Sequence, residues 1–313
     1  MLFAKSGAAK RSGDSVTSQN RRRSRLVKTI LGLIGGGERD AVILQTAFAA
    51  AAPLSAHLDF LHIHVSAGNA ALYDDAVQYA VGAAVAESLD ELTSKADKFS
   101  ALAANHVHEF CAGLKIEICE PPADRKKVTA NFREEKDATL ERLIYQAQNS
   151  DLTVLGRASQ TQGLSPYTLE RLVRNCGRPV LVAATTAPRT ITGTVMVCWN
   201  KSDNVVRAVT AATPILKNAK RVVFASVAMH NKEDIAIEDD LIRQVASNGV
   251  STETQIIPDR GRIPSLLATT ADDRDADLII MGAYGRSRMH ELIFDSCTDA
   301  LLRDIDRPIL LMH

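Results

Sequence analysis

Short apolar runs alternate with stretches of helical periodicity through most of the chain. In the first half, the apolar runs predict strands at 27–34, 58–65, 114–119, 151–155 and 179–184. Stretches with apolar residues three and four positions apart predict helices at 38–52, 85–110, 137–148 and 167–175. Strands that alternate with helices favour a parallel sheet covered on both faces, because right-handed crossovers place each helix over the sheet.

The same order returns in fewer residues after a hinge at Ala187-Pro188-Arg189. Strands are predicted at 194–199, 221–227, 252–257, 277–281 and 308–312. Helices are predicted at 204–216, 237–247, 263–273 and 289–304. Each half therefore reads as a small doubly wound domain, and we predict a first domain at 26–187 and a second at 188–313.

An internal repeat supports a duplication. The segment Asp151-Leu-Thr-Val-Leu-Gly156, followed by Gly177-Arg-Pro-Val-Leu-Val182, returns as Asp277-Leu-Ile-Ile-Met-Gly282, followed by Asp306-Arg-Pro-Ile-Leu-Leu311. Each copy has an acidic residue, an apolar run that ends in glycine, a helix-length stretch, an Arg-Pro pair and a second apolar run. A strand that ends in glycine is where such duplicated α/β units usually bind ligands.

Charge is unevenly distributed, although the 37 basic and 37 acidic residues cancel. Residues 1–28 hold eight basic residues and one acid, Asp14, so this end carries a net charge of about +7. We predict a disordered basic tail at 1–25, because this segment lacks the apolar periodicity that a packed core needs. Its run Arg21-Arg22-Arg23-Ser24-Arg25 could contact nucleic acid or anionic lipid, but such runs are usually solvated. No other contact with nucleic acid is expected.

Composition favours a soluble protein of two ordinary domains, since 46% of the 313 residues are hydrophobic and 24% are charged. The longest apolar stretch, 47–58, contains Pro53 and is too short to cross a bilayer, and the first residues lack the apolar core of a signal peptide. The five cysteines are scattered and form no Cys-x-x-Cys pair, which favours reduced thiols. We expect a cytoplasmic protein with no membrane partner and no structural zinc.

The second half contains a spaced glycine motif. Gly282 and Gly285 follow a predicted strand with two residues between them, and Asp295-Ser296 follows after nine more residues. This pattern resembles the universal stress protein family, whose nucleotide-binding members carry Gly-x-x-Gly, nine residues, then Gly and a Ser or Thr after the fourth strand. Asp295 stands where that family has its later glycine.

The start of the second half resembles the same family. Val197-Cys-Trp-Asn-Lys-Ser202 is similar to the family's first strand and its Asp-Gly-Ser turn, with Asn200 and Lys201 in the first two positions of the turn. The resemblance covers about residues 26–313 as topology and spacing, but its specific motif lies only in the second half. It implies a tandem member with two Rossmann-like domains of the adenine-nucleotide alpha hydrolase type.

The resemblance also implies how the two domains pair. Their last strands, 179–184 and 308–312, would form an intramolecular pseudo-dimer that protects both strand edges. The alternative is that these are simply buried core strands. A further homodimer stays open.

A site for ATP or AMP in the second domain follows from the same resemblance. Glycines after a strand let the backbone approach phosphate, and the following helix N-terminus attracts the anion. Gly282, Gly285 and Ser296 would contact the phosphates and Asn200 the base or ribose, while basic residues would offset the charge of Asp295. The predicted nucleotide-binding set is Asn200, Lys201, Ser202, Val227, Met281, Gly282, Gly285, Arg286, Arg288 and Ser296. The alternative is that Gly282 and Gly285 only shape a tight turn.

The first half matches this motif less well. Gly156-Arg157-Ala158-Ser159 replaces Gly-x-x-Gly, and no Gly-Ser pair follows at the right spacing. Its first loop, Gly35-Gly36-Gly37, also departs from the Asp-Gly-Ser turn. Three glycines at a helix start could hold a small anion, and a flexible turn is the simpler alternative. We therefore expect a degenerate site in this half.

Neither a metal site nor a catalytic centre is predicted. His62 and His64 share one face of a predicted strand but lack a third ligand, and His106 and His108 point in different directions on a helix. The sequence contains no nucleophile turn such as Gly-x-Ser-x-Gly. We expect a non-catalytic stress-response protein whose second domain binds ATP or AMP weakly. The alternatives are a nucleotide-free interaction scaffold and a slow nucleotide hydrolase.

Overall fold

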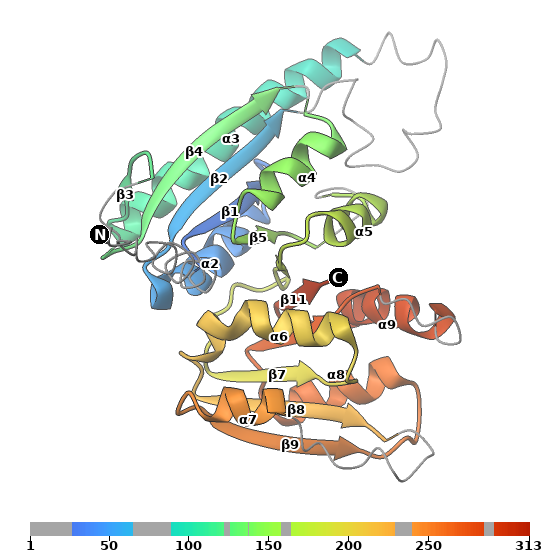
Figure 1. Cartoon of the computed structure of the whole chain (residues 1–313). Helices are drawn as coiled ribbons and strands as arrows, with labels where there is room; N and C mark the ends of the chain where they lie inside the picture. Colours follow the sequence, from blue (N-terminus) through green and yellow to red (C-terminus); the bar gives the residue numbers. More distant parts are fainter. Residues whose placement is uncertain are drawn as a thin grey trace, which may run out of the picture.

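A computed structural model describes residues 27–64, 89–121, 126–136, 138–157, 164–228, 240–284 and 291–313, with only the backbone for 89–95 and 291–296. The predicted tail at 1–25 lies outside these residues. The strands form one continuous sheet in the order β3-β4-β2-β1-β5-β6-β11-β10-β7-β8-β9. In Figure 1 the first half occupies the upper part of the molecule and the second half the lower part.

The first half contributes six strands to this sheet. Its elements are β1 Thr29–Ile34, α2 Asp40–Ala51, the 3-10 helix η1 Ala52–Leu54, β2 His57–His64, α3 Leu89–Leu114, β3 Glu117–Ile118, β4 Thr129–Lys136, α4 Leu140–Gln148, β5 Leu152–Leu155, α5 Pro166–Asn175 and β6 Val180–Val182.

The second half contains every strand and helix predicted for it. Its elements are β7 Thr194–Cys198, α6 Asp203–Leu216, β8 Arg221–Val227, α7 Asp240–Ala246, β9 Ser251–Ile257, α8 Ile263–Asp273, β10 Leu278–Gly282, α9 Glu291–Asp304 and β11 Ile309–Met312.

One strand of the first half was predicted wrongly. The expected strand at 114–119 shrinks to the two residues of β3, because α3 continues to Leu114. The strand beside β2 is instead β4, which pairs with β2 along its whole length, from Thr129 opposite His57 to Lys136 opposite His64. The sequence of β4 carries four charged residues among its eight, so it reads as a polar loop.

Within each half the strands are parallel, and strand order reverses at one point. In the first half, β1 lies between β2 and β5, and in the second half β7 lies between β8 and β10. The crevice at the carboxyl ends of strands that flank such a reversal is the usual ligand site of an open α/β sheet. We call these positions, β1/β5 and β7/β10, the first and second switch points.

The two halves join through their last strands. β6 and β11 pair antiparallel, with Leu181 opposite Leu310, so the pairing predicted for an intramolecular pseudo-dimer is present. This is the only antiparallel pair among the described strands. The strands of the two halves consequently run in opposite directions.

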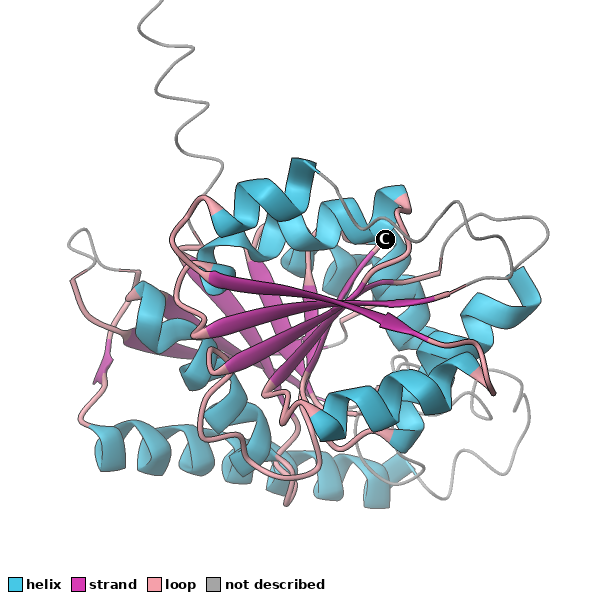
Figure 2. Cartoon of the chain, turned by 90° about the horizontal axis from the view of Figure 1, so that it is seen from below, coloured by secondary structure: helices cyan, strands magenta, loops and turns pink. Residues whose placement is uncertain are grey.

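Helices cover both faces of the sheet (Figure 2). One core lies under α2, α3, α6 and α7, and the other lies under α4, α5, α8 and α9. Each core continues through both halves. The central strands β5 and β6 are buried at every position, as expected for parallel strands packed on both sides.

The aspartate that begins each copy of the internal repeat holds two neighbouring strands together. Asp151 accepts hydrogen bonds from the Lys28 and Thr29 amides at the start of β1, at 2.8 and 3.1 Å. Asp277 accepts one from the Thr194 amide at the start of β7, at 2.7 Å. The acidic residue of each copy therefore fixes a neighbouring strand and is not part of a ligand site.

None of the described helices is both long and apolar enough to cross a membrane.

Candidate functional site

The second switch point brings together two segments that the sequence predicted as a site. β7 and β10 are adjacent and parallel, with Ile280 opposite Val197. Asn200, Lys201 and Ser202 follow β7, and Gly282 ends β10. Because the carboxyl ends of parallel strands meet at one edge of a sheet, these residues lie at the same rim.

Gly282 packs tightly against the first turn of α6. A Cβ atom at this position would lie 2.6 Å from the Val205 amide nitrogen and 2.8 Å from the Asn204 Cβ. The Asn204 side-chain amide donates to the Ala283 carbonyl oxygen at 2.8 Å. Glycine is therefore required here so that the end of β10 can approach the helix N-terminus.

The turn between β7 and α6 is fixed by its own side chains. Asn200 Oδ1 accepts hydrogen bonds from the Ser202 amide at 3.1 Å and the Ser202 hydroxyl at 2.7 Å. Ser202 Oγ in turn accepts from the Val205 amide at 3.3 Å and caps α6. Lys201 is exposed and has a φ of +57°, the left-handed conformation that glycine adopts most readily.

The first turn of α6 can receive an anion. The amides of Asp203 and Asn204 bond to no residue in the described part of the chain. Unsatisfied amides at a helix N-terminus, together with the helix dipole, favour a negatively charged group.

The remaining predicted site residues are placed differently. The Met281 side chain is buried in the core under α8 and α9, and Val227 at the end of β8 packs against the same core. Gly285, Arg286 and Arg288 lie outside the described residues. Ser296 belongs to α9, as does Asp295, and their side chains also lie outside the described part. Their contacts with phosphate stay a prediction.

Trp199 belongs to the core. It is only 2% exposed and packs edge-on against Phe224, with ring centroids 5.7 Å apart. Its indole nitrogen has no hydrogen-bond partner among the described residues. The side chain therefore stabilises the base of the second switch point.

The first switch point is filled by a carboxylate of the chain itself. Asp40, only 2% exposed, accepts hydrogen bonds from the Gly35 amide at 2.9 Å and the Gly36 amide at 2.8 Å. His106 Nδ1 on α3 donates to the same carboxylate at 2.9 Å. Gly36 has a φ of +81°, and a side chain there would overlap the Phe99 carbonyl, so this loop requires glycine.

The residue after Gly156 is directed at the other half of the molecule. Arg157 is buried and donates to the carbonyl oxygens of Ala183 at 3.1 Å, Arg307 at 2.7 Å and Leu302. Burial lowers the pKa of its guanidinium below the ordinary value. This side chain joins the halves, which leaves it no part in a first-half anion site.

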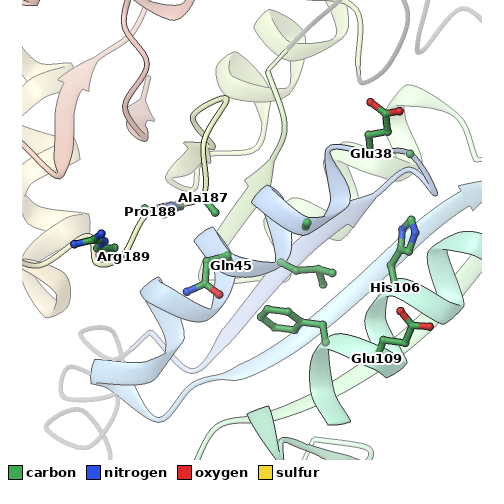
Figure 3. A pocket seen from close by; sticks show the side chains of 11 residues that line it. Glu38, Gln45, His106, Glu109, Ala187, Pro188 and Arg189 are labelled. Carbon is green, nitrogen blue, oxygen red and sulfur yellow. The ribbon is translucent and has the colours of Figure 1, made fainter. Parts of the chain in front are cut away.

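A groove that the sequence did not predict lies beside the first switch point. It has a volume of about 570 Å³ and runs between α2, α3 and the linker 187–189. Figure 3 shows Glu38, His106 and Glu109 toward one end and Gln45 with Ala187–Arg189 toward the other. Its lining is mostly apolar and includes Leu44 and Phe110. Its lining comes from three distant segments, so no local motif could have indicated it.

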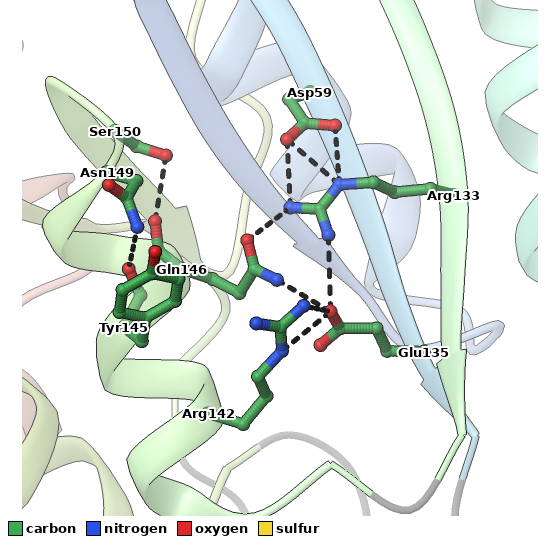
Figure 4. Close-up of polar contacts among 8 residues, drawn as sticks. All are labelled: Asp59, Arg133, Glu135, Arg142, Tyr145, Gln146, Asn149 and Ser150. Atoms are coloured by element: carbon green, nitrogen blue, oxygen red, sulfur yellow. Dashed lines mark hydrogen bonds and ion pairs between the residues drawn. The ribbon is translucent and has the colours of Figure 1, made fainter.

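A polar cluster on the opposite face of the first half is engaged internally (Figure 4). Arg133 on β4 forms a two-pronged ion pair with Asp59 on β2, with N–O distances of 2.9 to 3.0 Å. Glu135 accepts hydrogen bonds from Arg142 and Gln146 of α4. These pairs connect α4 to the sheet and offer no site.

The histidines considered for a metal are hydrogen-bonded to other groups. His62 Nδ1 lies 2.9 Å from the Ile34 carbonyl oxygen, His64 Nε2 lies 3.0 Å from Asp97, and His108 Nδ1 lies 2.6 Å from the Ala104 carbonyl oxygen. No group of three or more metal-ligating side chains occurs within the described ranges.

All five cysteines are free thiols. Four are buried, and burial raises the pKa of Cys111 and of Cys297 to about 11. A thiol with such a pKa is a poor nucleophile at neutral pH, because it is the thiolate that reacts. Cys119 is the partly exposed exception.

Known proteins resemble this chain both in the sequence of its second half and in overall fold. Residues 200–313 match the family model described as the universal stress protein family. A universal stress protein from Archaeoglobus fulgidus is similar in structure, with a TM-score of 0.62, 14% identity and coverage of 92% of this chain and 96% of that chain. A putative universal stress protein from Pseudomonas aeruginosa has a TM-score of 0.53, 16% identity and coverage of 93% and 94%.

A shorter solved structure, a universal stress protein in complex with cAMP, is 24% identical and covers 39% of this chain and 96% of that chain, with a TM-score of 0.31. A search of the curated proteins found no match. Residues 200–313 are therefore similar to the universal stress protein family, and the first half repeats the sheet topology of the matched region.

Proposed function

We propose that the chain is a non-catalytic stress-response protein whose second half binds an adenine nucleotide, ATP or AMP, weakly at the second switch point. The observation that carries this proposal is the contact of Gly282 with the first turn of α6, where two amides have no partner in the described part of the chain. Phosphate oxygens are suited to such a turn, because amide donors and the helix dipole act on the same anion.

Two carboxylates argue for weak binding. Asp203, the first residue of α6, adds an exposed carboxylate beside the amides. Asp295 replaces the later glycine of the family motif. Lys201 is exposed in the turn before α6 and supplies the opposite charge. Two unit charges about 4 Å apart interact by roughly 1 to 4 kcal/mol between bulk water and a protein surface, so repulsion by one carboxylate lowers affinity considerably.

A nucleotide-free interaction scaffold is the second candidate. The first switch point favours this candidate. The Asp40 carboxylate already accepts the hydrogen bonds of the Gly35 and Gly36 amides there, so these amides are not available to a nucleotide phosphate. We propose no catalytic residue, and a slow nucleotide hydrolase would require one at the second switch point.

Calorimetry with ATP and AMP on the full chain tests the proposal. We expect dissociation constants in the micromolar to millimolar range and no phosphate release. Lys201→Ala should weaken binding a few-fold, since exposed ion pairs contribute about 0.2–1 kcal/mol. Lys217→Ala, an exposed lysine at the other end of α6, is the matched control and should bind as the native chain does. No binding at millimolar nucleotide by either the native chain or Asp295→Gly would favour the scaffold.

A further inference from the structure

A residue of the first half holds the loop that follows β10 in the second half. Arg174 on α5 donates from Nη1 to the Tyr284 carbonyl oxygen at 3.1 Å. Its guanidinium carbon also lies 4.8 Å from the centroid of the Tyr284 ring, within the range of a cation–π interaction. Tyr284 is only 3% exposed, so the contact is shielded from water.

Arg174 is itself held in place. Its Nε donates to Glu170 Oε1 at 2.7 Å, one turn earlier on the same helix. A planar guanidinium with one edge bonded to a carboxylate has a restricted orientation. Held in this way, its Nη1 is directed at the Tyr284 carbonyl oxygen.

The loop needs such support because its backbone is strained. Tyr284 has a φ of +52°, a conformation that costs a residue with a side chain free energy unless its surroundings impose it. The preceding Ala283 carbonyl oxygen is held by Asn204 at 2.8 Å and lies 3.0 Å from His313 Nδ1. Among these contacts, the one made by Arg174 comes from the first half.

The contact has a counterpart across the joint between the halves. Arg157, in the loop after β5, donates to the Leu302 and Arg307 carbonyl oxygens of the second half. Each half thus has the loop at its switch point lying against the other half. The surface that joins the halves and the loop proposed to meet phosphate are in direct contact.

We propose that Arg174 is a positioning residue of the nucleotide site, through which the first half sets the direction in which the chain leaves β10. The ligand is the phosphate portion of the adenine nucleotide, so this inference rests on the proposed function. The first half, whose own loop amides are occupied by Asp40, thereby takes part in binding by the second half.

The test compares substitutions on one helix. Arg174→Ala should raise the dissociation constant for ATP by about 2- to 30-fold, the range typical of coupling through residues outside a site. Arg174→Lys keeps the charge but loses the planar fork, so its affinity should be intermediate. Arg171→Ala is the matched control, because Arg171 on α5 also packs over a ring, that of Tyr167 in the same helix.

A second measurement separates positioning from loss of folding. Hydrogen exchange of the amides at 282–284, without nucleotide, should be faster in Arg174→Lys than in the native chain, while circular dichroism stays unchanged. Should Arg174→Ala fail to fold, Arg174→Lys carries both measurements. An Arg174 variant that binds ATP as tightly as the native chain overturns the inference and leaves the proposed function intact, even if its melting temperature falls. Failure of the native chain to bind nucleotide overturns both.

Discussion

The two switch points share one topology but differ in where the nearest carboxylate lies. Both α2 and α6 begin with aspartate, Asp40 and Asp203. Five residues separate β1 from α2, whereas four separate β7 from α6. Asp40 is buried and bonds to the loop amides, while Asp203 is exposed and bonds to nothing among the described residues. A small change in a turn therefore decides whether a loop satisfies its own amides or leaves them for a ligand.

Removing the two aspartates gives the largest expected contrast. Asp40→Ala leaves two loop amides and His106 without their acceptor, and we expect it to lower the free energy of unfolding by about 2–4 kcal/mol, because a buried donor that loses its partner costs about 1–3 kcal/mol. Asp203→Ala should cost only about 0.3–1 kcal/mol, the contribution of an exposed acid in a first helical turn. Urea unfolding measures both, and equal losses would contradict the comparison.

Gly156, directly after β5, and Gly282, the last residue of β10, form the next matched pair. Gly282→Ala places a Cβ 2.6 Å from a backbone nitrogen of α6, so we expect a loss of about 1–3 kcal/mol from overpacking and weaker ATP binding. At Gly156, among the described residues, the Cβ would meet only the end of the Ile43 side chain, at 3.1 Å. Gly156→Ala should therefore cost less in thermal and urea unfolding. A larger loss of unfolding free energy in Gly156→Ala than in Gly282→Ala would contradict the close packing of β10 on α6.

Substitution of two lysines that have left-handed backbone conformations tests the role of the turn at the second switch point. Lys201 has a φ of +57° and Lys115, after α3, a φ of +56°. Lys201→Gly and Lys115→Gly should each raise the free energy of unfolding by up to about 1 kcal/mol, because glycine adopts this conformation without steric cost. Only Lys201→Gly should weaken ATP binding in calorimetry. A similar loss of affinity in Lys115→Gly would show that the effect is not local.

Asp306 provides the smallest expected effect, at the joint between the halves. Burial alone would raise the pKa of its carboxyl, but hydrogen bonds from Thr185 and Thr186 and the charge of Arg157 bring that pKa below its ordinary value. A lowered pKa in the folded state means that the carboxylate stabilises the fold above the unfolded pKa of about 3.9 and that this contribution is lost as pH falls through the folded pKa.

The measurement is the difference in unfolding free energy between the native chain and Asp306→Asn. We expect at most about 1 kcal/mol at pH 6, because the group is largely exposed, and a smaller difference near pH 3. Asp273→Asn, an exposed aspartate on α8, should show no such dependence on pH. A difference that grows toward acid would reverse the assigned role of Asp306.

The fold could be predicted wherever strands are apolar on both faces. Residues such as Val195–Val197 and Ile279–Met281 are buried in strands and read unmistakably as β in the sequence. β4 could not be predicted, because one of its faces carries Arg133 and Glu135. Asp59 and Arg142 pair with these charges, and Gln146 donates a hydrogen bond to Glu135. Charges that are paired across elements look like a solvated loop when only one segment is read.

The candidate site could be predicted only in part. Spacing identified Gly282, but the reason for glycine, its contact with α6, requires the fold. Asp40 was missed, although an aspartate just after three glycines at a helix start is a signal that could have indicated a self-filled loop. Arg174 gave no signal, because it reaches Tyr284 only through the pairing of β6 with β11.

The antiparallel pairing of β6 with β11 also makes the two opposite rims of the sheet different from each other. Strands of the first half point their carboxyl ends toward one rim of the sheet, and those of the second half point toward the opposite rim. At one rim the loop amides are occupied by Asp40, whereas the other rim would change its charge if the proposed nucleotide binds there. A partner protein that contacts the second-half rim could therefore distinguish nucleotide-bound from nucleotide-free molecules. A partner that binds the first-half rim would meet the same surface in both states. A symmetric dimer of identical subunits would present the same kind of rim twice.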